Sequence, residues 1–208
     1  MKKRVLLTGA TGFVGRQVVV ALCKEDVDLL LVVRDDSASR LSLTSVGDIV
    51  HTRDLFKESA EWWASVCQGV DVVIHAAWYA EPGAYVQSPK NLDCLTGTLQ
   101  LASGCVKAGV QRFVGIGSCS EYDISVGHLS IDTPLRPTTP YAGAKAATFL
   151  TLSTLLPQQG IAFAWARLFY LYGEGEDARR LVPYLRARLS AGEPAELTSG
   201  AQIRDYLD

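Results

Sequence analysis

The sequence predicts an α/β fold of the doubly wound type, in which helices cover both faces of a parallel sheet. Two observations lead to this prediction. Short aliphatic or β-branched runs alternate with longer helix-compatible stretches along nearly the whole chain. Several of the short runs are apolar at consecutive positions, as strands that are covered on both faces must be. The resulting βαβ order is typical of one main domain in a chain of 208 residues.

Strands are expected where the apolar runs are short. They are Arg4 to Thr8, Leu29 to Val33, a weaker Ile49 to Thr52, Val70 to His75, Arg112 to Gly117 and Ile161 to Arg167. Helices are expected in the longer stretches between them. They are Phe13 to Lys24, a stretch with Trp62 and Trp63, Leu92 to Ala108, Tyr141 to Leu156 and an amphipathic segment from Leu181. Gly69 and Gly109 stand where helices often end, and each precedes a strand.

Composition excludes several classes of protein. With 48% hydrophobic and 20% charged residues and a net charge of −2, the chain is that of an ordinary globular protein. Lys and Arg are dispersed, so neither a nucleic-acid surface nor a basic membrane patch is expected. The N-terminal apolar run is only about four residues long, which favours a first strand over a signal peptide. Since no run approaches the roughly 18 apolar residues of a membrane span, we expect a cytoplasmic protein.

Cysteine usage agrees with that compartment. The five cysteines are odd in number and show no C-x-x-C spacing, which fits reduced thiols better than disulfides or a zinc site. No metal site is therefore expected.

The first predicted strand runs directly into TGATGFVG, where glycines recur every third residue just before the first helix. They are Gly9, Gly12 and Gly15. Glycines there permit a tight turn and let the backbone approach a pyrophosphate, whose charge then lies at the helix N-terminus. A glycine trio alone is weak evidence, but this one has the required strand, turn and helix around it. The pattern therefore favours dinucleotide binding over a turn that serves only packing.

The second predicted strand ends in VVRDD, where a dinucleotide site needs a contact for the adenosine ribose. An acid there would hydrogen-bond the 2′-hydroxyl of NAD, whereas an arginine would accommodate the 2′-phosphate of NADP. Arg34 comes first at the strand end, followed by Asp35 and Asp36. The order favours NADP, with NAD still possible, and the three charges could also be only a solvated turn.

The segment GSCSEYD at residues 117–123 follows another predicted strand. Most such clusters are polar loops, but open α/β folds also place their ligands at the carboxyl ends of strands, so Ser118 is a candidate. YAGAK places Tyr141 and Lys145 at i and i+4, on one face of a helix. A lysine cation close to a phenol lowers its pKa, and such a phenol can exchange the proton of a hydroxyl or carbonyl. Together with the glycine loop, these residues favour catalysis over a structural pair.

These motifs together resemble the extended short-chain dehydrogenases/reductases, specifically the group of nucleotide-sugar epimerases and dehydratases. The resemblance covers essentially all 208 residues. Its most specific pieces are TGATGFVG, VVIHAAW, GSCSEY, DTPLRPTTPYAGAK, RLFYLYGEGE and IRDYLD. It implies a Rossmann fold, a nicotinamide dinucleotide cofactor and a nucleotide-sugar substrate.

The resemblance also implies which residues contact the cofactor. Beside the three glycines and Arg34, the matching positions are Thr11, Phe13, Val14, Asp54, Leu55, Ala76 and Ala77. The first three would hold the pyrophosphate, Asp54 and Leu55 would flank the adenine, and Ala76 and Ala77 would line the cofactor at the fourth strand end. A metal-ligand or base role for the adjacent His75 is weakly supported, because no second ligand or orienting group stands at a useful spacing.

For the reaction, the resemblance implies a catalytic set of Ser118, Tyr141 and Lys145. Ser118 would hydrogen-bond the sugar oxygen, Tyr141 would exchange its proton, and Lys145 would lower the pKa of the tyrosine and hold the nicotinamide ribose. The hydride belongs to the cofactor. On the substrate side the resemblance places Ser120, Tyr170 and Arg204. The last of these would face the nucleotide diphosphate, with which arginine pairs well.

Two departures from the family's pattern narrow the chemistry. The 4,6-dehydratases of the family carry an Asp-Glu pair directly after the position of Ser118, and this chain has Cys119 and Ser120. Neither residue can act as the acid and carboxylate of an elimination, so dehydration is not expected. Tyr170 stands where an Asn commonly contacts the sugar nucleotide, although Arg167 and Tyr172 of the same motif are present.

Residues 1–172 are predicted to form the dinucleotide-binding domain, and residues 173–208 the beginning of a small substrate-binding domain. Members of the family continue well past IRDYLD, so we expect a chain truncated at Asp208. The family also pairs through two long helices, which predicts a homodimer formed through Leu92 to Ala108 and Tyr141 to Leu156. Apolar residues on the first of these helices could equally be ordinary core packing. They are Leu95, Leu99, Ala102 and Val106.

The sequence leaves three functions open. The leading one is an NADP-dependent reductase of a 4-keto group on a nucleotide-linked deoxysugar. The second is an epimerase that oxidises and re-reduces the same carbon with a retained NAD. The third is a dinucleotide-binding sensor or assembly factor without catalysis, against which the intact tyrosine and lysine argue.

Overall fold

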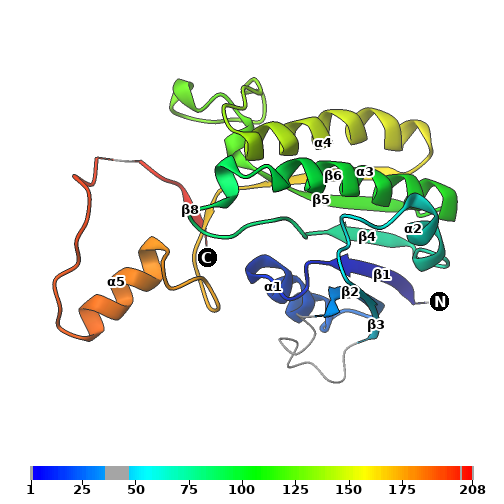
Figure 1. Cartoon of the computed structure of the whole chain (residues 1–208), viewed down its shortest axis with the longest axis horizontal. Coiled ribbons are helices and arrows are strands. Elements are labelled where there is room, and N and C mark those ends of the chain that lie inside the picture. Colours follow the sequence, from blue (N-terminus) through cyan, green and yellow to red (C-terminus); the bar gives the residue numbers. More distant parts are fainter. Residues whose placement is uncertain (1, 36–46, 202, 208) are drawn as a thin grey trace.

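The computed structural model of the protein describes residues 2–35, 47–201 and 203–207, and its elements alternate as the sequence predicts (Figure 1). The main sheet contains β1 (Lys3–Thr8), β2 (Val27–Arg34), β3 (Asp48–Thr52), β4 (Val72–His75), β5 (Arg112–Ser118) and β6 (Ala162–Leu168). The helices are α1 (Phe13–Leu22), α2 (Ala60–Val66), α3 (Lys90–Ala108), α4 (Pro140–Gln158) and α5 (Leu181–Ser190). The described residues also form the short 3-10 helices η2 (Tyr85–Gln87), η3 (Cys119–Glu121) and η4 (Ile124–Val126). A separate small sheet pairs β7 (Tyr170–Leu171) with β8 (Tyr206–Leu207).

The main sheet is parallel throughout and has the strand order β3-β2-β1-β4-β5-β6. This order confirms the predicted doubly wound fold, because the chain starts in the middle, builds outward to β3 and then returns to build the other half. The direction reverses between β1 and β4. Ligands of open α/β sheets bind at such a switch point, outside the carboxyl ends of the strands.

Both faces of the sheet around β1 and β2 are covered, which explains the unbroken apolar runs of these strands. Leu6, Leu30 and Val32 face a core shared with Trp63 of α2 and Leu101 of α3. The alternate residues of the same strands face the other way and pack with α1. They are Val5, Leu7, Leu29, Leu31 and Val33, and they form a second core with Val19 of α1. Figure 1 shows α3 and α4 side by side on one face and α1 on the other.

Local sequence signals fix the ends of the helices. Thr139 caps α4 by accepting a hydrogen bond from the backbone N–H of Ala142, and Pro140 occupies the first turn, where its missing N–H costs nothing. Gly109 ends α3 in the left-handed conformation, as predicted. The cap of α2 is Cys67, with Gly69 two residues beyond it. None of the helices in the described part of the chain is both long and apolar enough to cross a membrane.

The apolar residues of helix α3 were expected either to form a dimer contact or to pack in the core. Ala102 is buried in the core that also contains Trp63 and Leu101, and Leu99 and Val106 pack against it. Core packing is therefore confirmed for these three residues. The homodimer stays a prediction.

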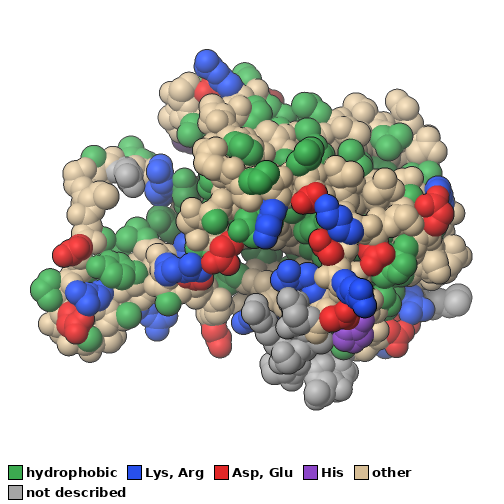
Figure 2. Space-filling view, in the orientation of Figure 1, with side chains coloured by type: hydrophobic (Ala, Val, Ile, Leu, Met, Phe, Trp, Pro, Cys, Tyr) green, Lys and Arg blue, Asp and Glu red, His purple; other side chains and the backbone are tan. Residues whose placement is uncertain are grey.

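The chain beyond β7 is much less buried than the part that forms the main sheet. Helix α5 has no buried residue and stands apart from the sheet, on the side where the strands end (Figure 1). Apolar side chains in this part are largely exposed, among them Leu181, Leu189, Leu197 and Ile203. Figure 2 shows this arm standing off the body of the molecule with hydrophobic side chains on its surface. The predicted domain boundary at residue 172 remains a prediction.

Candidate active site

The glycine loop lies between β1 and α1 and touches the end of β4. Gly9 has φ +79°, and a Cβ at this position would lie 2.6 Å from the backbone nitrogen of Ala77. A Cβ on Gly15 would lie 1.9 Å from the Gly9 carbonyl oxygen. Only glycine fits at both positions, so the loop packs directly onto Ala76 and Ala77, as expected if all of them line one site.

The same loop leaves the N-terminus of α1 open. Gly12 is the N-cap of this helix, and no described side chain caps its first N–H groups. Thr11 precedes it, and its carbonyl oxygen accepts a hydrogen bond from Arg16 Nε at 3.0 Å. Phe13 and Val14 form the first turn. A glycine cradle in front of uncapped helical N–H groups is the arrangement that binds a pyrophosphate, so these residues fit a dinucleotide.

The expected adenosine contacts lie at the ends of β2 and β3. Arg34 and Asp35 are exposed there, and the Asp35 carboxylate lies 3.7 Å from the ring of His51 on the neighbouring strand. Asp36 lies outside the described residues. Asp54 uses its side chain locally, accepting a hydrogen bond from the N–H of Phe56 at 3.0 Å. Leu55 is buried in the core next to it, which stiffens this wall of the site.

His75 at the end of β4 is a structural histidine in this arrangement. Its Nδ1 lies 2.8 Å from Thr8 Oγ1 and its Nε2 lies 2.9 Å from Thr98 Oγ1. The Thr98 hydroxyl donates its hydrogen to the Cys94 carbonyl, so its oxygen accepts the hydrogen bond from His75 Nε2. Burial lowers the pKa of His75 to about 3. A neutral ring with both nitrogens occupied serves neither as a metal ligand nor as a base.

Ser118 and Tyr141 are brought together at the carboxyl edge of the sheet. Ser118 ends β5, and Tyr141 lies in the first turn of α4, close enough for the Ser118 side chain to influence the pKa of the phenol. The Ser118 hydroxyl also donates to Ser120 Oγ at 3.0 Å and accepts from the N–H of Ser120 at 3.2 Å. Ser120 therefore orients Ser118, a contact that the sequence did not predict.

The pKa of Tyr141 differs from the expectation. Burial raises it to about 12, and the neighbouring Ser118 hydroxyl opposes this rise only in part. Two aromatic rings meet Tyr141 edge-on, from Tyr85 at 4.8 Å and from Trp78 at 6.4 Å between centroids. In this enclosure the phenol is neutral at physiological pH and has a proton that it can donate.

Lys145 explains why the expected lowering is not seen. Its Nζ donates to the carbonyl of Ile116 at 2.6 Å and lies 3.8 Å from the centre of the Trp78 ring. The ammonium is therefore held against β5 and Trp78. Burial lowers the pKa of Lys145 to about 7, which reduces the positive charge available to influence Tyr141.

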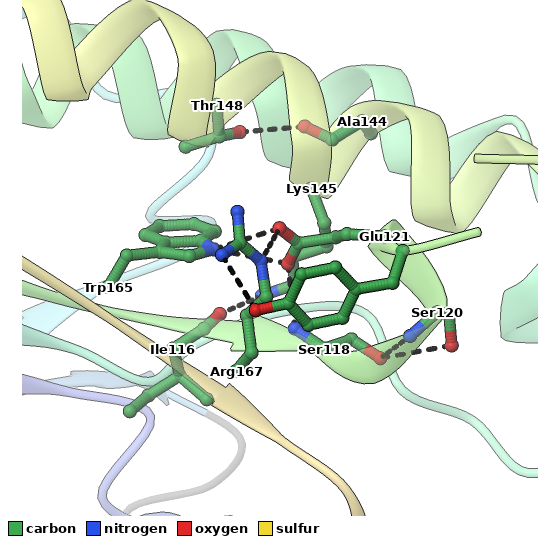
Figure 3. Close-up of polar contacts among 10 residues, drawn as sticks. Ile116, Ser118, Ser120, Glu121, Ala144, Lys145, Thr148, Trp165 and Arg167 are labelled. Atoms are coloured by element: carbon green, nitrogen blue, oxygen red, sulfur yellow. Dashed lines mark hydrogen bonds and ion pairs between the residues drawn. The ribbon is translucent and has the colours of Figure 1, made fainter. Parts of the chain in front are cut away.

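A buried ion pair lies directly behind Ser118, and the sequence did not identify it as part of the site. The Glu121 carboxylate accepts hydrogen bonds from the N–H of Ser118, from Trp165 Nε1 and from Arg167 Nε. Figure 3 shows Trp165 and Arg167 of β6 converging on Glu121, with Lys145 entering the same cluster from α4. The sequence signals were a carboxylate in the strand-end loop and an arginine in the next strand, but nothing in the sequence pairs them.

Tyr170 and Arg204, expected on the substrate side, lie together. The Arg204 guanidinium lies 5.0 Å from the centre of the Tyr170 ring, and Tyr170 also packs on Tyr206 at 5.6 Å across the β7–β8 pair. Burial raises the pKa of Tyr170, and the positive charge of Arg204 opposes this rise.

Comparison with known proteins agrees with this geometry. The model of the NAD dependent epimerase/dehydratase family matches residues 5–208. A dTDP-6-deoxy-L-talose 4-dehydrogenase (NAD(+)) of Aggregatibacter actinomycetemcomitans is 24% identical over 208 residues, which cover 98% of this chain and 75% of that protein.

Solved structures show the same fold. The UDP-N-acetylglucosamine 4-epimerase of Methanobrevibacter ruminantium superposes with a TM-score of 0.82 at 22% identity, covering 100% of this chain and 69% of that one. MoeE5 in complex with UDP-glucuronic acid and NAD gives a TM-score of 0.77 at 32% identity, covering 98% and 67%. The chain thus spans between two thirds and three quarters of the length of these proteins. Since the family model matches nearly every residue and the fold is shared, the chain belongs to the NAD dependent epimerase/dehydratase family.

Proposed function

We propose that this chain carries the catalytic site of an NAD(P)-dependent oxidoreductase that acts at carbon 4 of a nucleotide-linked deoxysugar and reduces a 4-keto group to an alcohol. One observation carries the proposal. The neutral phenol of Tyr141 lies beside Ser118 at the edge of the sheet where the glycine loop also lies.

The residues that would hold the cofactor are those of the glycine loop and the neighbouring strand ends. Gly9, Gly12 and Gly15 let the backbone approach the pyrophosphate, and the N–H groups of α1 receive its charge. Lys145 would hold the nicotinamide ribose. When bound, the reduced nicotinamide supplies the hydride.

The proton comes from Tyr141. Reduction of a ketone leaves negative charge on its oxygen, and a neutral phenol with a pKa of about 12 can donate a proton to that oxygen because an alkoxide is far more basic. The Ser118 hydroxyl would hydrogen-bond the same oxygen as charge develops, which stabilises the transition state more than the ground state. The raised pKa of Tyr141 supports the reducing direction.

Dehydration at carbons 4 and 6 does not fit the site. Elimination needs an acid and a carboxylate, and this chain has Cys119 and Ser120 at those positions. Burial raises the pKa of Cys119, so its thiol stays protonated. Ser120 is already engaged with Ser118.

The relatives support the proposed class of substrate. The relative from Aggregatibacter is a 4-dehydrogenase of a dTDP-linked deoxysugar, and MoeE5 binds UDP-glucuronic acid with NAD. We therefore propose a nucleotide diphosphate sugar as substrate. Ser120, Tyr170 and Arg204 would contact it, and residues 173–208 would begin the domain that covers it.

A 4-epimerase is the second candidate. The same Ser118, Tyr141 and Lys145 could oxidise carbon 4 and reduce it again, provided that the cofactor stays bound. The family and the NAD in MoeE5 favour NAD for such a cycle, whereas Arg34 at the end of β2 favours NADP and release after each reduction.

One experiment separates the two candidates. The purified protein is incubated with NADPH or NADH and a dTDP- or UDP-linked 4-keto-6-deoxysugar, and separately with the corresponding 4-hydroxy sugar without added cofactor. Both the cofactor and the sugar product are followed. Stoichiometric consumption of reduced cofactor with formation of the 4-hydroxy sugar supports the reductase. Interconversion of two 4-epimers without net cofactor change, together with NAD in the mass spectrum of the denatured protein, supports the epimerase. Bound cofactor with neither reaction contradicts both.

A further inference from the structure

A carboxylate that the proposed reaction does not use lies immediately behind the site. The Glu121 side chain is 0% exposed. It accepts hydrogen bonds from Ser118 N at 2.7 Å, from Trp165 Nε1 at 3.1 Å and from Arg167 Nε at 2.8 Å. The four residues come from the end of β5, from η3 and from β6, so the carboxylate ties the serine loop to the neighbouring strand (Figure 3).

The sequence of β5 is adapted to this carboxylate. A Cβ on Gly117 would lie 2.6 Å from Glu121 Oε1 and 2.2 Å from Trp165 Nε1. A Cβ on Gly115 would lie 2.3 Å from the Trp165 ring. Both glycines are therefore needed to make room for the acceptor and for one of its donors.

Stability alone does not account for this arrangement. Taking a carboxylate and a guanidinium out of water is costly, and well-packed apolar residues of the same volume often do as well or better. Arg167 adds to that cost, because its Nη2 is buried without a hydrogen-bond partner among the described residues. An apolar pair in place of Glu121 and Arg167 would supply neither the hydrogen bond to the Ser118 backbone nor a negative charge behind Ser118.

The hydrogen bond has a geometric consequence. Ser118 and Glu121 form a capping box, in which the Glu121 carboxylate holds the Ser118 N–H while the Ser118 hydroxyl accepts from the N–H of Ser120. Both ends of the turn are thereby fixed, and with them the position of the Ser118 hydroxyl.

The charge has an electrostatic consequence for Lys145. The titratable groups that interact with Lys145 come from three elements packed around it, namely Glu121 on η3, Cys94 on α3 and His75 on β4. His75 is neutral, and burial raises the pKa of Cys94 to about 11, so it too is neutral. Glu121 is the group that favours the charged ammonium against the cost of burial.

We propose that Glu121 is a positioning residue of the catalytic site, which aligns the Ser118 hydroxyl through its backbone and keeps Lys145 charged. The inference rests on the proposed function for the roles of Ser118 and Lys145. It adds a residue that touches neither substrate nor cofactor but controls two that do.

The first test measures Lys145 directly and needs no substrate. Lysines are labelled at the ε-carbon, the Lys145 signal is assigned with Lys145→Met, and its titration is followed by NMR. In Glu121→Gln the pKa of Lys145 falls below its value of about 7, because the carboxylate that favours the ammonium is gone. The matched control is Asp123→Asn, which removes a partly buried carboxylate two residues further along the same loop, where it pairs with Arg136, and leaves the Lys145 titration unchanged.

The second test separates positioning from folding. Glu121→Gln leaves a buried arginine unpaired and lowers the melting temperature, whereas the double variant Glu121→Gln with Arg167→Gln removes both charges and recovers most of that loss. Turnover does not recover with it. In both variants kcat falls on the order of 10²-fold, as misplaced catalytic groups typically cause, while the dissociation constant of the cofactor stays near that of the native protein.

The outcomes of the two tests distinguish a positioning role of Glu121 from a purely structural one. An unchanged Lys145 titration in Glu121→Gln, or full recovery of kcat in the double variant, overturns the inference and leaves Glu121 a structural residue. If the native protein shows no oxidoreductase activity but the titration shifts as expected, the electrostatic part of the inference stands and the proposed function is the part that fails.

Discussion

The ammonium of Lys145 lies 3.8 Å from the centre of the Trp78 ring, on its face. Trp78 is held in this position by its own indole N–H, which donates to Asn91 at 2.8 Å. Lys145 is only 4% exposed, and its ammonium donates a hydrogen bond to the carbonyl of Ile116. The aromatic face therefore replaces part of the water that a buried ammonium loses, and it favours the charged form.

Replacing Trp78 by leucine is expected to lower the pKa of Lys145 below about 7, because the cation loses its aromatic partner while the site stays apolar. NMR of labelled lysine side chains measures this shift. Trp62→Leu is the control, since Trp62 packs edge-on against Trp63 at 4.8 Å in the α2 region. An unchanged pKa of Lys145 in Trp78→Leu would contradict the prediction.

Lys145→Met is expected to stabilise the protein near neutral pH. The folded-state pKa of Lys145 is about 7 and the ordinary value is 10.5, so between them the unfolded chain binds more protons and native stability rises with pH. Below about pH 7 the native protein bears the full cost of the buried charge, which methionine removes. The free energy of unfolding in urea should therefore favour the variant by a few kcal/mol near pH 6, and the difference should shrink toward pH 10. Lys107→Met, at an exposed site paired with Glu61, should show no such pH dependence.

Tyr141→Phe removes the proposed proton donor and leaves the packing against Tyr85 in place. Turnover should fall by about 10²- to 10⁴-fold, the usual contribution of acid–base catalysis, with little change in cofactor affinity. Tyr184→Phe on α5 is a matched control, because that hydroxyl only accepts a hydrogen bond from the N–H of Glu196. Undiminished turnover in Tyr141→Phe would exclude the phenol as the donor.

Gly15→Ala should abolish dinucleotide binding. The new methyl group would lie 1.9 Å from the Gly9 carbonyl oxygen, so the loop must open, at a cost of roughly 1–3 kcal/mol in stability. The control is Gly143→Ala in α4, where a Cβ meets nothing within 4 Å and alanine should stabilise the helix by about 0.5–1 kcal/mol. Titration with NADH and NADPH, combined with thermal unfolding, measures both effects. Normal binding by the Gly15 variant would show that the cofactor lies elsewhere.

Arg34→Ala tests the choice of cofactor. If Arg34 meets the 2′-phosphate of NADP, its loss should weaken NADP binding by about 10- to 100-fold, the value of a charge-assisted hydrogen bond, and leave NAD binding nearly unchanged. Asp35→Ala is the companion variant, because Asp35 is the described acid at the same strand end and pairs with His51. A selective loss of NAD affinity in Asp35→Ala, with Arg34→Ala silent, would assign the cofactor as NAD.

The sequence located every strand of the main sheet, because an apolar run between turn residues is a local signal. Their ends were less predictable. β2 begins at Val27 rather than at Leu29 because Val27 pairs with Lys3 of β1, and β4 begins at Val72, which pairs with Val5. A strand ends where its partner ends, and the partner lies elsewhere in the chain.

The residues of the candidate site also divide into those that a local sequence pattern predicts and those that only the fold brings together. The glycine loop and the Tyr141–Lys145 spacing are short patterns whose geometry follows from one turn or one helix, so the sequence revealed them. Glu121 and Arg167 are 46 residues apart, and Trp78 and Lys145 are further apart still. No local pattern pairs such residues, and only the packed fold brings them together.

What the sequence alone determined is the family and the sheet, and it also named a candidate hydroxyl, phenol and amine for the edge of that sheet. Only the tertiary structure decided how these groups titrate. Lys145 was expected to lower the pKa of Tyr141, yet burial raises that pKa to about 12 and lowers that of Lys145 to about 7. The reason is physical, since loss of water and the charges of distant segments set the protonation of a buried group, and both exist only once the chain has folded.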